Sequence, residues 1–196
     1  MITAPALRPA RPAEAEKIAD LLARAYAADP VFLWLLERRA ASTLPRLFNP
    51  LVRWFARGGS VTVAADPVRL LGAAVWSPTT GRRPPGTTWG GLFPGRGGDP
   101  LVRLLWSHSA RERQPTRPHR HLVLLGVEPG LGGEGSGTRL LAAGLAGCDA
   151  RRLGAYTEVN TPSAVGFFLG HDFEVVAEGP LMAGAPDSWG LWRHPR

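Results

Sequence analysis

The chain has 196 residues, 44% hydrophobic and 20% charged, which is typical of one soluble globular domain. Its formal net charge is +7, but the positive charge is almost entirely arginine spread along the chain, without a basic stripe or a nucleic-acid motif. We therefore expect no nucleic-acid partner. No apolar stretch reaches the length of a transmembrane helix and the N-terminus lacks a signal-peptide core, so we expect no membrane partner and a cytoplasmic location. A single cysteine excludes an internal disulfide, and the histidines lack metal-ligand spacing, so we expect no metal site.

The N-terminal part of the chain predicts helices followed by two strands. Apolar residues recur at helical spacing up to Asp29-Pro30, where the first helix should end. A later helix should be irregular, because Pro45 and Pro50 each remove a backbone hydrogen bond. The expected elements are helices over 11–30, 31–39 and 42–59, and strands over 60–65 and 68–78.

The C-terminal part predicts alternating strands and helices after a long surface segment. Residues 78–99 are rich in proline and glycine, and we expect a loop there, followed by a helix over 99–113. The further expected elements are strands over 121–127, 154–160, 173–179 and 188–193, and helices over 135–148 and 163–170. No linker or repeat divides the chain, so residues 1–196 form one predicted domain, with 78–120 as a variable loop and helix.

A glycine-rich loop, "GVEPGLGGEGSGTRLL" (126–141), joins a predicted strand to a predicted helix, where backbone N–H groups can hold a phosphate. A nucleotide triphosphatase loop would need Lys-Ser/Thr after its last glycine, but Gly137 is followed by Thr138-Arg139. A dinucleotide fingerprint is a further alternative, because residues 130–135 spell G-x-G-x-x-G and Glu158 ends the next strand. Glu128-Pro129 separates the strand from the first glycine, which weakens that alternative.

The segment "LGVEPGLGGEGSGTRLL" resembles the acyl-CoA loop of the GNAT N-acetyltransferase superfamily, in which a Q/R-x-x-G-x-G/A turn begins a long helix. "TEVNTPSAVGFFLGHDFEVV" is similar to the second motif of that superfamily, a strand followed by a short helix and another strand. The resemblance implies a single-domain α/β GNAT fold: a mixed central sheet with a splayed strand pair, and helices on both faces. It also implies acetyl-CoA or another acyl-CoA as cofactor, and an N-acetyltransferase that acts on an amine of a small metabolite or peptide by direct attack.

The resemblance places the cofactor at specific residues. The pantetheine arm would pair with the splayed strand at Leu125, Gly126 and Val127, and the N–H of Val127 would polarise the thioester carbonyl. Amides at the start of the next helix would hold the pyrophosphate. The residues of that loop are Gly132, Gly133, Glu134, Gly135, Ser136, Gly137 and Thr138.

The sequence departs from the family pattern at several of these positions. The leading Gln or Arg of the loop is Gly132, and Glu134 stands where a basic residue is common. In the second motif the tyrosine that often protonates the departing thiolate is Phe168, and the glycine before the last phenylalanine is Asp172. A catalytically silent GNAT-like module that binds CoA or another ligand is therefore an alternative.

The remaining candidates concern catalysis and the acceptor. Glu158, at the end of its strand, is the leading candidate for the base, and His121 is a second, because histidine titrates near neutral pH. Asp29 can bind an amine or cap the helix that begins at Pro30. The aromatic side chains Phe32, Trp76 and Trp89 are candidates for an acceptor cleft, with core packing as the alternative for Trp76. The sequence leaves the acceptor, the acyl-chain length and a homodimer open.

Overall fold

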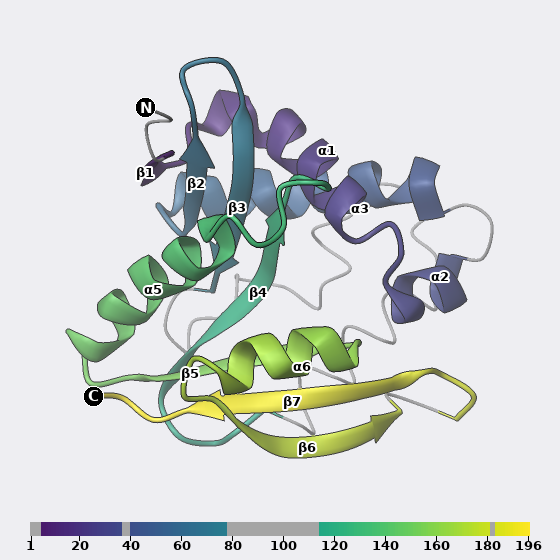
Figure 1. The fold of residues 1–196 in the computed structure, drawn as a ribbon, viewed down its shortest axis with the longest axis vertical. Coiled ribbons are helices and arrows are strands. Elements are labelled where there is room, and N and C mark those ends of the chain that lie inside the picture. The colour runs from purple at the N-terminus through teal and green to yellow at the C-terminus, as the bar shows by residue number, and fades with distance from the viewer. Residues whose placement is uncertain (1–4, 37–39, 78–113, 181–182) are drawn as a thin grey trace.

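The computed structural model describes residues 5–36, 40–77, 114–180 and 183–196, and the predicted helix over 99–113 lies outside them. One seven-stranded sheet of order β1-β2-β3-β4-β5-β7-β6 crosses the molecule (Figure 1). Every neighbouring pair is antiparallel except β4 and β5, which are parallel. The strands are β1 (Ala6–Pro9), β2 (Val61–Ala65), β3 (Leu70–Trp76), β4 (His119–Val127), β5 (Gly154–Val159), β6 (Glu174–Pro180) and β7 (Asp187–Arg193).

Helices cover both faces of this sheet, and together they enclose two clusters of buried residues. The helices are α1 (Ala15–Ala25), α2 (Pro30–Leu36), α3 (Ala40–Arg57), α5 (Ser136–Asp149) and α6 (Pro162–Leu169), with a short 3₁₀ turn at Pro12–Glu14. The predicted mixed α/β sheet with helices on both faces is therefore confirmed.

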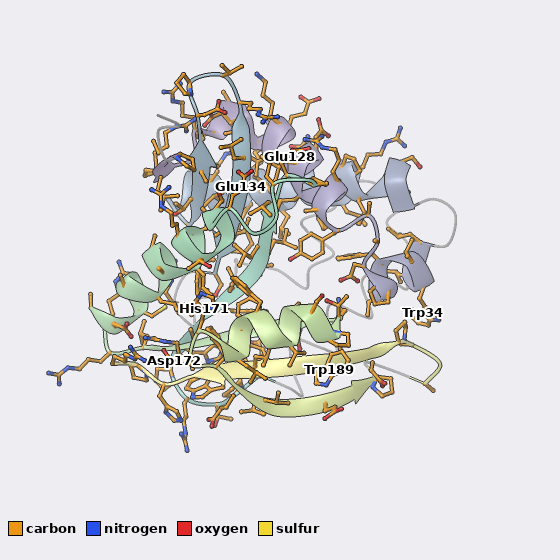
Figure 2. All side chains as sticks on the ribbon, in the orientation of Figure 1. Trp34, Glu128, Glu134, His171, Asp172 and Trp189 are labelled. Atoms are coloured by element: carbon orange, nitrogen blue, oxygen red, sulfur yellow. The ribbon has the colours of Figure 1, made fainter. Side chains whose placement is uncertain are left out.

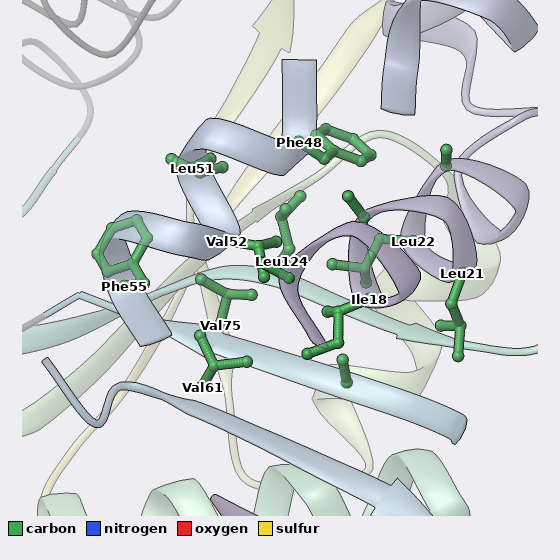
Figure 3. Packing of buried hydrophobic residues seen from close by; sticks show 14 of the residues in the cluster. Ile18, Leu21, Leu22, Phe48, Leu51, Val52, Phe55, Val61, Val75 and Leu124 are labelled. Atoms are coloured by element: carbon green, nitrogen blue, oxygen red, sulfur yellow. The ribbon is translucent and has the colours of Figure 1, made fainter. Parts of the chain in front are cut away.

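The first cluster lies between the sheet and helices α1 to α3. Figure 3 shows Ile18 and Leu22 of α1 packed with Val52 of α3 over Val75 and Leu124 of the sheet. The buried positions of α3 recur at helical spacing, and this packing holds 18 residues in one helix although Pro45 and Pro50 lie inside it. The buried residues of α3 are Leu44, Phe48, Leu51, Val52, Phe55 and Ala56. The irregular helix predicted from the prolines is thus continuous, because tertiary burial outweighs the lost hydrogen bonds.

The second cluster joins α5 and α6 to the opposite face. Trp76 is 2% exposed, and its indole lies directly beneath Gly144 of α5. A Cβ atom at Gly144 would overlap that indole, so glycine lets the helix approach the strand. The single cysteine, Cys148, is buried in the same cluster, as a small apolar residue would be.

This contact makes a testable prediction about stability. We expect Gly144→Ala to lower the free energy of unfolding by about 1–3 kcal/mol through overpacking, although alanine is the better helix former. Gly147→Ala is the matched control on the same helix, since its Cβ would meet only the flexible end of Arg120 at 3.4 Å. It should raise stability by up to about 1 kcal/mol. Urea denaturation of both variants measures the difference, and equal stabilities would contradict the packing described here.

The parallel pair β4 and β5 separates partway along its length. Pairing runs from His119 opposite Gly154 to Leu122 opposite Thr157, and the hydroxyl of Thr157 donates to the carbonyl of Leu122 at 3.0 Å. Beyond Leu122 strand β4 continues to Val127, paired only with β3. The two strands thus splay as expected, and the segment Val123–Val127 presents a strand edge that β5 does not cover.

Candidate active site

A cavity of about 410 Å³ lies at the point where β4 and β5 separate. Its walls come from the end of α1 with the turn that follows it, the last part of β4, the end of β5 and the start of α6. The predicted residues Leu125, Gly126, Val127, Glu158 and Phe168 all line it. Segments far apart in the sequence, predicted to serve one site, therefore meet at one cavity.

The backbone of β4 faces this cavity at alternate residues. The N–H and the C=O of Leu125 both contact the hydroxyl of Tyr26 at 3.2 Å, on the side away from β3. The N–H of Glu128 donates to Leu71 on the β3 side at 2.8 Å. Because backbone groups alternate along a strand, those of Val127 point to the cavity side with those of Leu125. The open edge can therefore pair with an extended ligand.

The glycine loop ends in a turn that only small residues adopt easily. Gly130, Gly133 and Gly135 have φ angles of 87°, 85° and 78°, in the left-handed region. Gly135 is the N-cap of α5, and the first helical hydrogen bond runs from the N–H of Arg139 to its carbonyl at 3.0 Å. The N–H groups of the first helical turn have no partner within the helix, so this end of α5 can hold an anion.

The acidic side chains around the loop do not occupy this helix end. Glu128 forms a two-pronged pair with Arg24, with both contacts at 2.8 Å, and this hydrogen bonding lowers the pKa of Glu128. Glu134 is exposed to solvent. Figure 2 labels both on the segment between β4 and α5. Water and salt therefore screen the charge of Glu134, which stands where the related loops often carry a basic residue.

Glu158 is held in the cavity by a neighbouring tyrosine. The hydroxyl of Tyr156 donates to Oε1 of Glu158 at 3.1 Å, and the tyrosine is fully buried. The two residues are two positions apart on β5 and therefore share one face of the sheet. Gly190 of β7 makes room for this hydroxyl, because a Cβ there would lie 2.8 Å from it. The Tyr156 contact orients the carboxylate of Glu158.

Asp29 caps a helix and lines the cavity at the same time. Its Oδ1 accepts hydrogen bonds from the N–H groups of Val31 at 3.0 Å and Phe32 at 3.1 Å, at the start of α2. The side-chain amide of Asn160 contacts both of its carboxylate oxygens, at 3.1 and 3.0 Å. Burial raises the pKa of Asp29, and these hydrogen bonds oppose that rise. Both alternatives left open by the sequence, capping and a place in the acceptor site, are compatible with this position.

Helix α6 closes the cavity with an apolar side chain. Phe168 is 4% exposed and packs edge-to-face against Phe167 and Phe173, so the wall carries a phenyl ring where the related motif often has a phenol. Asp172 has a φ angle of 65°, which explains the preference for glycine at that position of the motif. His171 contacts the carbonyl of Phe167 through Nδ1 at 2.7 Å.

Of the three aromatic residues predicted for the acceptor site, two lie outside the cavity lining and the third is not among the described residues. Trp76 is packed beneath α5 and does not line the cavity, so its placement in the acceptor site is corrected to core packing. Phe32 is 7% exposed and packs against Tyr26 and Phe48 behind the cavity wall. Trp89 lies outside the described residues, as does most of the variable region 78–120.

His121 is a weak candidate for the base. It lies at the start of β4, outside the cavity lining, and its Nδ1 contacts the side-chain amide of Gln114 at 3.1 Å. Burial lowers the pKa of His121 to about 3, so the imidazole is neutral and weakly basic at neutral pH. Glu158, which lines the cavity, is therefore a better candidate for the base than His121.

The described part of the cavity lining carries acidic but no basic side chains. Among the described residues that line it are two carboxylates, Asp29 and Glu158, and none of them is a lysine, arginine or histidine. The part of the chain that the structure describes contains no cluster of potential metal ligands. None of the described helices is both long and apolar enough to cross a bilayer.

Sequence comparison does not assign the chain to a family, because no protein-family model and no curated protein matches it. Comparison with solved structures does find similar folds. A Corynebacterium glutamicum protein described as histone acetyltransferase HPA2 and related acetyltransferase is 21% identical, with 99% of this chain and 98% of that chain covered and a TM-score of 0.69. A Drosophila melanogaster polyamine N-acetyltransferase that forms N-acetylagmatine is 15% identical, with coverage of 96% and 99% and a TM-score of 0.66. The C-terminal condensation domain of Ebony, in complex with β-alanyl-dopamine, is 13% identical, with coverage of 96% and 98% and a TM-score of 0.72.

At these identities the similarity establishes the fold. The chain has the GNAT fold of N-acetyltransferases over nearly its whole length. The condensation domain is not named as an acetyltransferase, so the fold by itself does not decide the reaction. The reaction must be argued from the cavity.

Tyr26 and Asn160 contact predicted residues of the cavity but were not themselves among the sequence candidates. Tyr26 reads as one more apolar position of α1, and its partner Leu125 lies 99 residues away. The sequence indicates only that Asn160 lies at the end of a strand, and its hydrogen-bond partner Asp29 is 131 residues away in the chain. No local pattern of the sequence pointed to either contact.

Proposed function

We propose that this protein is an acyl-CoA-dependent N-acyltransferase that transfers an acyl group, in the first instance acetyl, to an amine. The observation that carries the proposal is one cavity that joins a strand edge without a neighbouring strand to an oriented carboxylate. The edge is at Leu125 and Val127, and the carboxylate is Glu158. The anion-binding end of α5 directly follows the same strand. The similarity in fold to N-acetyltransferases supports the same proposed activity.

The chain offers groups that fit CoA. The N–H groups of Ser136, Gly137 and Thr138, at the start of α5, would hold the pyrophosphate with the helix dipole. A Cβ at Gly137 would lie 3.8 Å from Val127, so the loop and the strand edge are close together. Leu125 and Val127 would pair with the pantetheine arm as a neighbouring strand does. Gly132 and Gly133 would let the loop backbone approach the phosphates.

Bound acyl-CoA supplies an activated thioester, which an amine attacks directly so that the C–S bond breaks and the CoA thiol leaves. The carboxylate of Glu158 would take a proton from the ammonium group of the acceptor, which leaves the neutral amine that attacks, while the Tyr156 hydroxyl keeps Oε1 in place. The N–H groups on the open edge of β4 would hold the carbonyl oxygen as negative charge develops on it. The residues mainly position the reactants and exclude water.

The acceptor is an amine of a small metabolite or a peptide. The two carboxylates of the cavity favour a cation over an anion, and none of the described residues that line the cavity is basic. A similar fold belongs to an enzyme described as acetylating agmatine, which is a cationic amine. Catalysis by Glu158 and amine binding near Asp29 are parts of this proposal.

A second candidate is a silent module that binds CoA without turning it over. It is favoured by Phe168, which places no hydroxyl on the wall of α6. Loss of an acid alone slows such a reaction by about 10²–10⁴-fold without abolishing it. A thiol is in addition a tolerable leaving group, with an ordinary pKa of about 8.5. We therefore keep the enzyme as the first candidate.

Release of free CoA thiol separates the two candidates. The purified protein is incubated with acetyl-CoA and a panel of primary amines that includes agmatine, a polyamine, an arylalkylamine and a lysine peptide. Amine-dependent thiol release supports the transferase. The protein could instead bind CoA but release no thiol with any amine, whether the donor is acetyl-CoA or carries another acyl chain. The silent module would then be the better explanation.

A further inference from the structure

Tyr26 lines the cavity and contacts the strand edge that β5 does not cover. It follows the last residue of α1, and its hydroxyl oxygen lies 3.2 Å from both the nitrogen and the oxygen of Leu125. It therefore accepts from the N–H and donates to the C=O of one residue on the uncovered edge of β4. The Tyr26 side chain thus satisfies the backbone groups of Leu125 that a neighbouring strand or an extended ligand would otherwise bond.

The position of this hydroxyl is held by packing on both sides. The ring of Tyr26 stands edge-to-face against Phe32 and Phe48, with centroids 5.7 and 5.8 Å apart. Helix α1 also lies very close to β4, because a Cβ at Gly126 would be only 2.9 Å from the Cβ of Ala25. Burial raises the pKa of Tyr26 to about 12, so the group stays an O–H donor at neutral pH.

The other hydroxyl groups of the cavity lining are engaged elsewhere. Thr157 donates to the carbonyl of Leu122 at 3.0 Å, on the paired part of β4. Thr161 accepts from the N–H of Ala164 at the start of α6, and its hydroxyl contacts that of Ser163 at 3.2 Å. Among the described residues that line the cavity, only Tyr26 brings a hydroxyl to the open edge of β4.

We infer that Tyr26 is a catalytic residue whose O–H, together with the N–H of Leu125, binds the carbonyl oxygen of the acyl group. The role rests on the proposed acyl transfer. An amide N–H of an extended ligand takes over the carbonyl of Leu125, which releases the Tyr26 hydroxyl. The acyl oxygen takes over the N–H of Leu125, and the released O–H, already within 3.2 Å, donates to the same oxygen. Two converging donors then stabilise the charge that forms when the amine attacks.

Binding measurements test this role without knowledge of the acceptor. Free CoA has no acyl carbonyl, so the ratio of its Kd to that of acetyl-CoA reports the contacts to that group. Tyr26→Phe keeps the ring and removes only the hydroxyl. We expect the variant to bind CoA as the wild type does and to lose about three- to tenfold of the preference for acetyl-CoA, measured by calorimetry.

Infrared spectroscopy gives a second readout that a structural role would not move. With carbon-13 in the acetyl carbonyl, the thioester band should shift to lower frequency on binding to the wild type, and less on binding to Tyr26→Phe. With an amine that the wild type uses, kcat should fall by about 10²–10³-fold, as for loss of one oxyanion donor, with KM for the amine little changed. Ser60→Ala removes a hydroxyl that contacts the carbonyl of Gly58, away from the cavity lining, so it is the control for the binding ratio and the band and should alter neither.

The outcomes separate this role from the proposed function. If the wild type binds acetyl-CoA and Tyr26→Phe shows the same ratio and the same band, the role of Tyr26 is wrong and the acyltransferase stands. Tighter acetyl-CoA binding by the variant would mean that the hydroxyl competes for the strand edge, which also overturns the role. If the wild type binds neither CoA nor acetyl-CoA, the proposed function fails and the role of Tyr26 fails with it.

Discussion

Glu158→Gln should lower kcat for acyl transfer by about 10²–10⁴-fold, the usual contribution of a general base. The amide has nearly the same shape as the carboxylate and can still accept the hydrogen bond from Tyr156, so the cavity should keep its geometry. The amide cannot take up the proton that the ammonium group of the acceptor must lose before it attacks. Binding of acetyl-CoA should be unchanged, because Glu158 is assigned to the amine and not to the cofactor.

The rate of thiol release with a used amine measures this effect, and a matched variant controls for it. Glu174→Gln makes the same chemical change on the exposed strand β6, where Glu174 pairs with His194 at 3.3 Å, and should leave kcat as in the wild type. A full rate in Glu158→Gln would remove Glu158 from the mechanism.

Gly135→Asp should weaken CoA binding at least tenfold, for two physical reasons. The φ angle of 78° is costly for a side chain that carries a Cβ. The new carboxylate would also lie at the N-terminus of α5, where it would take the place of an anion and repel the pyrophosphate. Calorimetric titration with CoA measures the change in Kd.

Two further variants divide that effect into its parts. Gly135→Ala carries the backbone strain without the charge and should fall between the wild type and Gly135→Asp. Gly184→Asp places the same side chain at a φ angle of 80° in the turn before β7, away from the loop, and should bind CoA as the wild type does. Unchanged affinity in Gly135→Asp would show that the start of α5 is not the phosphate site.

The elements that were predicted correctly have a strong local pattern. Helix α5 follows a run of glycines and has buried residues at helical spacing, and it begins within one residue of the expected position. A continuous apolar run predicts strand β4. The fold class followed from the order of such elements and from the resemblance of the loop and of the second motif. The splay of β4 from β5 came from the resemblance alone.

The elements that were missed depend on contacts distant in the chain. Strand β1 is a four-residue edge strand that contains proline and arginine, and it exists because it pairs with β2. The continuity of α3 across its prolines depends on the buried face described above. Trp76 was expected near the acceptor, but an apolar run does not say which face of a strand a tryptophan takes.

The candidate site also contains residues that the sequence predicts and residues that it does not. The loop glycines and Glu158 are predictable, because a glycine-rich turn and an acid at the end of a strand are local sequence patterns. Tyr26 and Asn160 have none, because each meets its partner only after the sheet has formed. The two carboxylates of the described cavity lining could not be inferred from the net charge of +7, because that value describes the whole chain and not one site.

Calorimetric titration of the purified protein with acetyl-CoA, with NADH as the control ligand, tests the proposed function most directly. A CoA-dependent enzyme with this strand edge and this helix start should bind acetyl-CoA with a micromolar Kd and bind NADH far more weakly. Absence of acetyl-CoA binding, or a preference for NADH, would contradict the acyltransferase and reassign the glycine loop.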